Sequence, residues 1–359
     1  MKIAILLPDL RGGGAERVNL DLAYEFVRGG HTVEFVLQNA RGELLEEAQT
    51  HFSVVDLKCA RMRNLPKKLF HYLRGNRIEV LISAMWPLTV IGPLVGKFVS
   101  RKIVAIASEH AILSNSSKSD KRAHRVFRAI SALVGYRLAN HVVAVSRGVA
   151  ADISRISWIP QSEIKIINNP LRKFSIERLS SLEKPASLRS PGRTIIGIGS
   201  LTRTKNYALL IEAFSCLPTP HNIRLFILGE GPDRPNLEQL IQRKGLERSV
   251  FLPGFMGDLR PWFSSADLFV HTSNSEGFGN VLVEALSFGV PVVSTDCPTG
   301  PREILQDGKF GVLVPMNDSN ALCEAIIGML DSPMEPSVLT ERAADFQSSK
   351  IAKKYSSLF

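Results

Sequence analysis

Short apolar runs alternate with amphipathic stretches along the first half of the chain. Lys2–Leu7 has the length and apolar content of a buried strand, and Ala15–Arg28 carries apolar residues at helical spacing before Gly29-Gly30 ends it. Further buried strands are predicted at Thr32–Leu37, Val80–Ser83, Ile103–Ser108 and His141–Ser146. This order is typical of a doubly wound α/β domain with a parallel sheet.

The same order returns in the second half, after a polar break. Residues 176–193 contain Pro185 and Pro191 and interrupt the alternation, so we expect a linker there. Beyond it we predict a helix at Tyr207–Leu217 and strands at Thr194–Gly199, Arg224–Leu228, Val250–Leu252, Leu268–Val270 and Val290–Ser294. A chain of 359 residues is also long for a single core. The pattern therefore predicts two doubly wound, Rossmann-like domains that face a cleft, where ligands bind at the carboxyl ends of the strands.

The composition is that of a globular protein, with 45% hydrophobic and 22% charged residues. The four cysteines are scattered and form no CxxC pair, so we expect neither a zinc site nor a disulfide framework. The longest apolar stretch, Ala84–Val99, contains two prolines and two glycines and is shorter than the ~20 residues of a spanning helix. No secretory signal is recognisable at the start of the chain. A cytoplasmic location is expected.

The net charge of +10 is concentrated in the first half, because residues 1–185 hold 28 Lys and Arg against 16 Asp and Glu. Within residues 118–133, basic and apolar residues share a helical spacing: Lys121, Arg122, Arg125, Arg128, Val126, Phe127, Ile130 and Leu133. A basic amphipathic helix is typical of binding to an anionic membrane surface, here the inner face of the membrane. A phosphorylated substrate, nucleic acid and a merely solubilising surface are the alternative explanations of the excess positive charge. Few aromatic residues lie among the basic ones and no known binding motif is present, so we expect no nucleic-acid binding.

Two acids flank a glycine-rich turn in the second half. Glu276 and Glu284 lie eight positions apart, after the apolar run Ala266–Val270 and around the start of a helical pattern at Asn280–Phe288. A helix N-terminus favours an anion, and a carboxylate beside it accepts hydrogen bonds from hydroxyl groups. This combination of phosphate and polyol recognition predicts a sugar-nucleotide site.

Other glycine-rich loops follow predicted strands. Gly12-Gly13-Gly14 opens the first helix without the spacing of a dinucleotide fingerprint. Gly199 begins a loop that carries Arg203 and Lys205, two cations suited to a diphosphate. Gly229 ends a further strand. The three consecutive glycines favour a functional loop over a plain turn, whereas Arg203 and Lys205 are equally consistent with solvated loop charges. Gly229 by itself indicates an ordinary turn.

His110 ends an apolar strand of the first domain. A single histidine is more often structural than catalytic, but a place at a strand end facing the predicted cleft favours a functional role. The chain has no Ser/His/Asp order, HExxH motif or Walker loop.

In combination, these segments resemble the retaining glycosyltransferases of family 4, which have the GT-B fold. The resemblance covers nearly the whole chain and is specific as an ordered set of motifs. The matching motifs are Gly-Gly-Ala-Glu-Arg at 13–17, Val-Ala-Val-Ser-Arg at 143–147, Ile-Asn-Asn-Pro at 167–170, Gly-Ser-Leu-Thr-Arg-Thr-Lys-Asn at 199–206, Leu-Gly-Glu-Gly-Pro at 228–232 and the two acids of E-x7-E.

The resemblance implies roles for the matching positions. Glu284 would bind the nucleotide ribose, while Glu276, with the backbone of Gly277, Phe278 and Gly279, would lie near the donor hexose. The donor-binding set would be completed by Gly13, Gly14, Ala15, Gly199, Gly229 and Asn280.

The resemblance also implies the groups nearest the chemistry. Lys205 matches the lysine that contacts the diphosphate, and His110 matches a histidine that contacts the transferred sugar. The family's usual arginine after the strand glycine is Ser200 here, which leaves Arg203 as a candidate substitute. These cations, the loop amides and the helix N-terminus would neutralise the leaving nucleoside diphosphate without a metal or cofactor.

The implied activity is transfer of a hexose or N-acetylhexosamine, with retention, from a nucleotide sugar to a lipid-linked or polysaccharide acceptor in bacterial glycan biosynthesis. UDP is the commoner base, and GDP stays open. Residues 1–175 would bind the acceptor and 194–340 the donor, and a C-terminal helix within 341–359 would pack back on the first domain. A UDP-sugar epimerase of the same two-domain architecture is the alternative.

Overall fold

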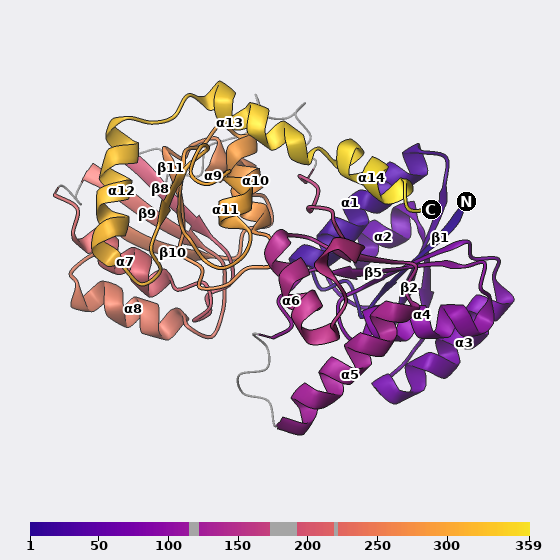
Figure 1. Cartoon of the computed structure of the whole chain (residues 1–359). Coiled ribbons are helices and arrows are strands. Elements are labelled where there is room, and N and C mark those ends of the chain that lie inside the picture. Colours follow the sequence, from indigo (N-terminus) through magenta and orange to yellow (C-terminus); the bar gives the residue numbers. More distant parts are fainter. Residues whose placement is uncertain (115–121, 173–191, 219–221) are drawn as a thin grey trace. The chain divides into compact units, whose positions relative to one another are not determined.

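The computed structural model describes residues 1–114, 122–172, 192–218 and 222–359 and forms two compact units (Figure 1). Unit 1 comprises Met1–Arg172 and Phe346–Phe359, and unit 2 comprises Lys173–Asp345. The linker expected at 176–193 lies almost wholly outside the described residues. Each unit contains one parallel sheet with helices on its faces, which confirms the predicted fold class.

Unit 1 contains a seven-stranded sheet in the order β3-β2-β1-β4-β5-β6-β7, in which all neighbouring strands are parallel. Its strands are β1 (Lys2–Leu7), β2 (Thr32–Leu37), β3 (Ser53–Asp56), β4 (Val80–Ala84), β5 (Val104–Glu109), β6 (His141–Ala144) and β7 (Ile164–Ile166). Its helices are α1 (Gly14–Arg28), α2 (Leu45–His51), α3 (Leu65–Gly75), α4 (Leu88–Val99), α5 (Arg122–Leu138), α6 (Arg147–Ser157) and α14 (Ser348–Ser356). From β1, the chain first adds β2 and β3 on one side of the sheet and then β4 to β7 on the other side. This change of direction is typical of doubly wound folds.

The two faces of this sheet are covered by different helices because its central strands are apolar on both sides. Phe26 of α1 belongs to the cluster that includes Ile5 and Ile82. Leu69 of α3 belongs to a second cluster, with Leu6 and Leu81. Alternate residues of one strand therefore enter different cores.

The C-terminal helix α14 packs on unit 1, as predicted. The Tyr355 ring lies 6.4 Å from the ring of Phe26, and the Phe359 ring lies 5.4 Å from it. The amide of Leu171 donates to the carbonyl of Phe346 at 2.7 Å where the chain re-enters unit 1. The preceding helix α13 (Pro336–Ala343) belongs to unit 2.

Unit 2 contains a six-stranded parallel sheet in the order β10-β9-β8-β11-β12-β13. Its strands are β8 (Arg193–Ile198), β9 (Ile223–Leu228), β10 (Val250–Gly254), β11 (Leu268–His271), β12 (Val292–Thr295) and β13 (Val312–Val314). Its other helices are α7 (Tyr207–Ser215), α8 (Arg234–Arg243), α9 (Arg260–Phe263), α10 (Asn280–Ser287), α11 (Pro301–Ile304) and α12 (Ser319–Asp331).

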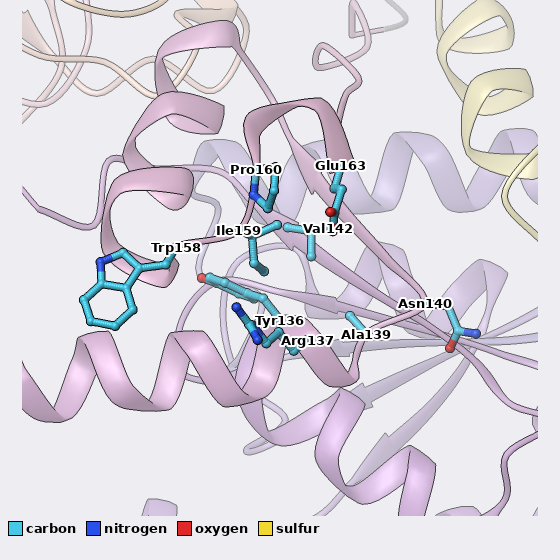
Figure 2. A pocket seen from close by; sticks show the side chains of 9 residues that line it. All are labelled: Tyr136, Arg137, Ala139, Asn140, Val142, Trp158, Ile159, Pro160 and Glu163. Atoms are coloured by element: carbon cyan, nitrogen blue, oxygen red, sulfur yellow. The ribbon is translucent and has the colours of Figure 1, made fainter.

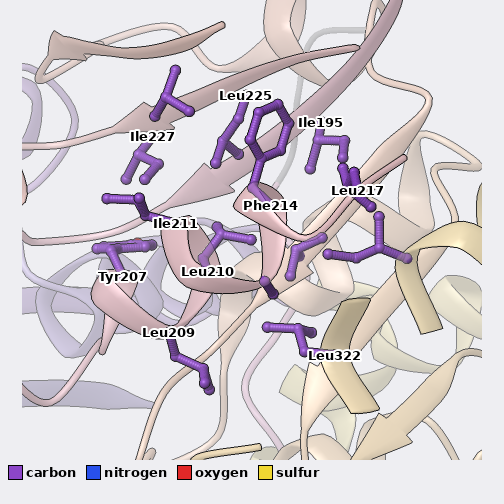
Figure 3. Close-up of a cluster of buried hydrophobic side chains, with 14 of the residues drawn as sticks. Ile195, Tyr207, Leu209, Leu210, Ile211, Phe214, Leu217, Leu225, Ile227 and Leu322 are labelled. Carbon is purple, nitrogen blue, oxygen red and sulfur yellow. The ribbon is translucent and has the colours of Figure 1, made fainter. Parts of the chain in front are cut away.

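The core of unit 2 forms between α7 and the sheet. Leu210 and Phe214 are fully buried and belong to one cluster with Leu225 and Ile227 of β9 (Figure 3). This packing holds α7 in place, and with it the loop between β8 and α7 that carries Lys205.

Candidate active site

The turn that carries Glu276 connects β11 to α10. Gly279 has a φ of 100° at the N-cap of α10, a left-handed conformation that favours glycine. Asn280 is the first residue of the helix. The Thr299 hydroxyl donates to the carbonyl oxygen of Glu276. A Cβ atom on Gly300 would overlap the carbonyl of Phe278, so the neighbouring loop packs directly on the backbone of this turn.

Glu276 is held through a single carboxylate oxygen. Its Oε1 accepts hydrogen bonds from Nζ of Lys205, from Nε2 of His271 at 2.9 Å and from the Ser273 hydroxyl at 2.7 Å. Burial opposes ionisation, but the hydrogen bond from His271 and the charge of Lys205 outweigh it and hold the pKa of Glu276 well below its ordinary value. The carboxylate is therefore ionised at neutral pH, and it has one oxygen clamped.

Lys205 reaches this carboxylate because two loops are tied together. The Thr272 hydroxyl donates to the Lys205 carbonyl at 2.9 Å, and the amide of Asn274 donates to the Thr204 carbonyl at 2.8 Å. A Cβ atom on Gly229 would overlap the carbonyl of Gly199, so the loop after β9 packs against the backbone after β8. The glycine-rich loops thus gather at the carboxyl ends of β8, β9 and β11.

His271 is a member of this cluster that sequence reasoning missed. It is the last residue of β11 and 3% exposed, and its Nδ1 lies 3.1 Å from the Ser294 hydroxyl on β12. The signal in the sequence was a polar residue that ends the apolar run Leu268–Val270 directly before the turn. The strand thereby places an imidazole behind the carboxylate.

Arg203 lies elsewhere in unit 2. Its side chain is exposed and lines a hollow of about 280 Å³ beside α7 and α8, together with Glu212, Asp233 and Arg243. Lys205, from the same loop, contacts Glu276 instead. The structure therefore brings only one of the two predicted cations to the carboxylate.

Glu284 lies within α10 and is 9% exposed. Phe278 is 3% exposed and Gly277 belongs to the same turn. The E-x7-E segment thus places one acid before the helix and one inside it, as the sequence predicted.

His110 lies in unit 1, directly after β5. Its Nε2 is 3.2 Å from the Ser108 hydroxyl, which is in turn 2.8 Å from the Tyr355 hydroxyl of α14. Burial lowers the pKa of His110 to about 4, while the neighbouring Asn169 side chain acts in the opposite direction. The imidazole is therefore neutral at physiological pH and can donate or accept a hydrogen bond.

Glu109 precedes this histidine and was also missed from the sequence. It is 1% exposed and accepts hydrogen bonds from the Thr89 hydroxyl and, at 2.6 Å, from the Tyr136 hydroxyl. Burial raises the pKa of Glu109 to about 7, although these hydrogen bonds act to lower it. The side chain connects the end of β5 to α4 and α5.

The first glycine loop also lies in unit 1. Gly13 is the N-cap of α1, with a φ of −70°, and Gly14 and Ala15 are its first residues. Of the three consecutive glycines, Gly12 is the one with positive φ, at 83°. The tight turn therefore precedes the helix by two residues.

Known families match both units. The model described as "Glycosyltransferase Family 4" matches residues 12–172, and the one described as "Glycosyl transferases group 1" matches residues 181–346. The chain is a family 4 glycosyltransferase.

Two curated relatives cover most of this glycosyltransferase. The lipopolysaccharide core biosynthesis glycosyltransferase LpsE of Rhizobium meliloti is 29% identical over 88% of this chain and 85% of its own. The N-acetylgalactosamine-N,N'-diacetylbacillosaminyl-diphospho-undecaprenol 4-alpha-N-acetylgalactosaminyltransferase of Campylobacter jejuni is 27% identical over 92% and 90%.

Solved structures share the fold of the glycosyltransferase. Anabaena HepE in complex with UDP-glucose matches 99% of this chain and 98% of its own, with a TM-score of 0.81 and 23% identity. A Rickettsia africae glycosyltransferase matches 99% and 97%, with a TM-score of 0.82 and 17% identity. These likenesses establish the GT-B fold that the sequence predicted.

Proposed function

We propose that this glycosyltransferase moves a hexose or N-acetylhexosamine from a UDP-sugar to a lipid-linked or polysaccharide acceptor in bacterial glycan biosynthesis, with retention of configuration and without a metal. The observation that carries the proposal is the clamped carboxylate of Glu276 beside Lys205 at the start of α10.

The geometry of Glu276 suits a sugar hydroxyl. The donors Lys205, His271 and Ser273 all meet Oε1, and the side chain keeps 12% of its surface exposed. Among the described residues no donor is assigned to Oε2, which is therefore the oxygen that accepts from a ligand. A carboxylate fixed in this way accepts without first losing water or rotating, and such preorganisation favours binding.

Lys205 supplies the positive charge for the diphosphate. Its ammonium group carries three donors, and one of them is used by Glu276. The group is half-buried, so its attraction for the growing charge of the leaving group is screened less than at the surface. The N-terminal amides of α10 add partial positive charge, and Glu284 would take the ribose hydroxyls.

His110 is proposed to contact the transferred sugar as a neutral group. Its ring is buried, and the neighbouring Asn169 side chain acts to raise the pKa that burial lowers. The Ser108 hydroxyl holds one ring nitrogen. A neutral imidazole can donate or accept a hydrogen bond, which suits a sugar hydroxyl group.

The names of the relatives support the donor and acceptor classes. HepE was solved with UDP-glucose, and the Campylobacter jejuni relative is named for an undecaprenol diphosphate acceptor. We propose the same classes here, and with them a peripheral place on the inner face of the membrane. No helix in the described part of the chain is long and apolar enough to cross a bilayer.

The test is a panel of UDP- and GDP-sugars, with membrane extract as the acceptor source and chelator present throughout. We expect one UDP-sugar to raise the melting temperature and to yield a lengthened glycolipid. Glu276→Gln should fold, as shown by circular dichroism, and lose at least about 100-fold in kcat/KM. Isomerisation of the UDP-sugar without acceptor, or full activity of the variant, would overturn the proposal.

A further inference from the structure

Three large apolar side chains of unit 1 are exposed on neighbouring helices. Trp158 is 77% exposed, Ile130 57% and Val134 47%. Trp158 directly follows α6, which packs against α5, the helix that carries the other two. Ile130, Val134 and the exposed Arg137 are spaced by four and three residues, so they share one face of α5.

Trp158 projects outward from this region. It lines a hollow of about 490 Å³ together with Arg137, Asn140 and Glu163. Figure 2 shows its ring turned away from the other side chains of the hollow. The indole is therefore available to an outside partner instead of forming a wall of a closed pocket.

The backbone at Trp158 makes this exposure unusual. The residue has a φ of 53° and ψ of 25°, the left-handed C-cap conformation that favours glycine or asparagine. A tryptophan there adds strain, and its exposed ring leaves a large apolar surface in water. Neither feature contributes to the folded core, which points to a role in binding.

Unit 1 as a whole is basic. Unit 1 holds 28 Lys and Arg against 14 Asp and Glu, while unit 2 holds 16 against 20. Arg137 lies on the same face as the apolar residues, and the acid of the hollow is Glu163. An indole beside aliphatic and cationic side chains is the composition of a surface that sits at a lipid headgroup boundary.

We propose that Ile130, Val134 and Trp158, bordered by Arg137, dock unit 1 on an anionic lipid bilayer, with the indole at the headgroup level. A lipid-linked acceptor is anchored in the bilayer, so docking there would bring the enzyme to its acceptor. The inference therefore rests on the proposed function. A second copy of the chain is a poorer occupant, because three side chains offer much less than the roughly 800 Å² per partner of a stable interface.

This surface shares only Ile130 with the residues named for the helix expected at 118–133. Residues 118–121 lie outside the described residues, as do the side chains through Phe127. Arg128 is engaged within the unit, because its Nη1 donates to the Leu113 carbonyl at 2.8 Å and its guanidinium lies 5.1 Å from the Trp86 ring. Val134 and Arg137 therefore continue α5 beyond the expected stretch, and Trp158 follows α6.

Intrinsic fluorescence tests the proposal directly. Of the three tryptophans, Trp262 is 4% exposed and Trp86 is half-buried, so Trp158 should dominate any response to lipid. The full chain is titrated with phosphatidylcholine vesicles, with and without phosphatidylglycerol. We expect a blue shift and quenching by brominated lipid with the anionic vesicles, and neither effect in Trp158→Phe.

Variants then measure the contribution to binding. Trp158→Ala should weaken vesicle binding about tenfold, and Ile130→Ser with Val134→Ser should add to the loss. Phe255→Ala is the matched control, since Phe255 is 67% exposed but belongs to unit 2, and it should bind as the wild type does. Circular dichroism confirms that each variant folds.

Two results would overturn the inference: wild-type emission that does not change at saturating anionic lipid, or a Trp158→Ala variant that binds vesicles like the wild type. UDP-sugar binding by thermal shift is measured in parallel. If the chain binds UDP-sugar but not vesicles, the proposed transfer stands and the proposed docking surface is wrong.

Discussion

The Nε2 atom of His271 lies 2.9 Å from Oε1 of Glu276, and the opposite ring nitrogen of His271 lies 3.1 Å from the Ser294 hydroxyl. The histidine thus connects the end of β12 to the carboxylate that is proposed to meet the donor sugar. It orients the carboxylate of Glu276 and is therefore a positioning residue for the proposed transfer.

Two substitutions separate the two contacts of His271. In His271→Gln, the amide nitrogen lies near the position of Nε2 and can still donate to Glu276. In His271→Asn, the shorter side chain reaches Ser294 but not Glu276. Loss of a hydrogen bond to a charged group costs about 1.5–3 kcal/mol. We therefore expect His271→Asn to lower kcat/KM by about 10- to 100-fold and His271→Gln to lower it less. Steady-state kinetics with varied donor measures both, and equal losses would contradict the positioning role.

Lys205 and Arg203 should contribute unequally to donor binding. Lys205 contacts the buried carboxylate, while Arg203 lines a separate hollow. We expect Lys205→Met to lower kcat/KM by at least about 100-fold and Arg203→Met by less than about threefold. A large loss in Arg203→Met would show that its flexible side chain takes the place of the arginine missing at Ser200. Binding of UDP alone, measured by calorimetry, distinguishes an effect on the diphosphate from one on the sugar.

Tyr355 should influence His110 from the C-terminal helix. Its hydroxyl lies 2.8 Å from that of Ser108, which contacts the imidazole. Tyr355→Phe keeps the ring packed on Phe26 but removes this bond, so we expect a loss of about 1 kcal/mol in the free energy of unfolding and a several-fold lower kcat. Tyr24→Phe removes a 3.3 Å bond to Glu47 in the same unit and should leave kcat unchanged.

Glu109 should make the protein less stable as the pH rises. Its pKa is raised to about 7 in the folded state, whereas the unfolded chain has the ordinary value near 4.3. Between these values the folded state binds the additional proton. The resulting stability is complete below about pH 4.3 and is lost as the pH rises through about 7.

Denaturation of wild type and Glu109→Gln at several pH values tests this. The difference between their free energies of unfolding should change by about 3 kcal/mol from pH 5 to pH 8, with the wild type losing stability relative to the variant. Parallel pH profiles of the two proteins would contradict the expectation. Comparing profiles cancels any constant cost of the substitution.

The sequence determined the fold class because buried parallel strands appear as apolar runs. The predicted central strands lie close to their observed bounds. The strands that were not predicted are β3, β7 and β13, each three or four residues long and each at the edge of a sheet. A strand of three or four residues is too short for its pattern to stand out from the flanking loops.

The sequence also determined the order of the motifs, and hence the family, because E-x7-E and the glycine loops are local features. Only the tertiary structure decided which side chains meet. It placed Lys205 on Glu276 and Arg203 in another hollow, although both belong to one loop. It added His271, and it linked Tyr355 through Ser108 to His110 across most of the chain length. The physical reason is that spacing along a chain sets which face of an element a residue occupies, whereas contacts between elements depend on how sheets and helices pack.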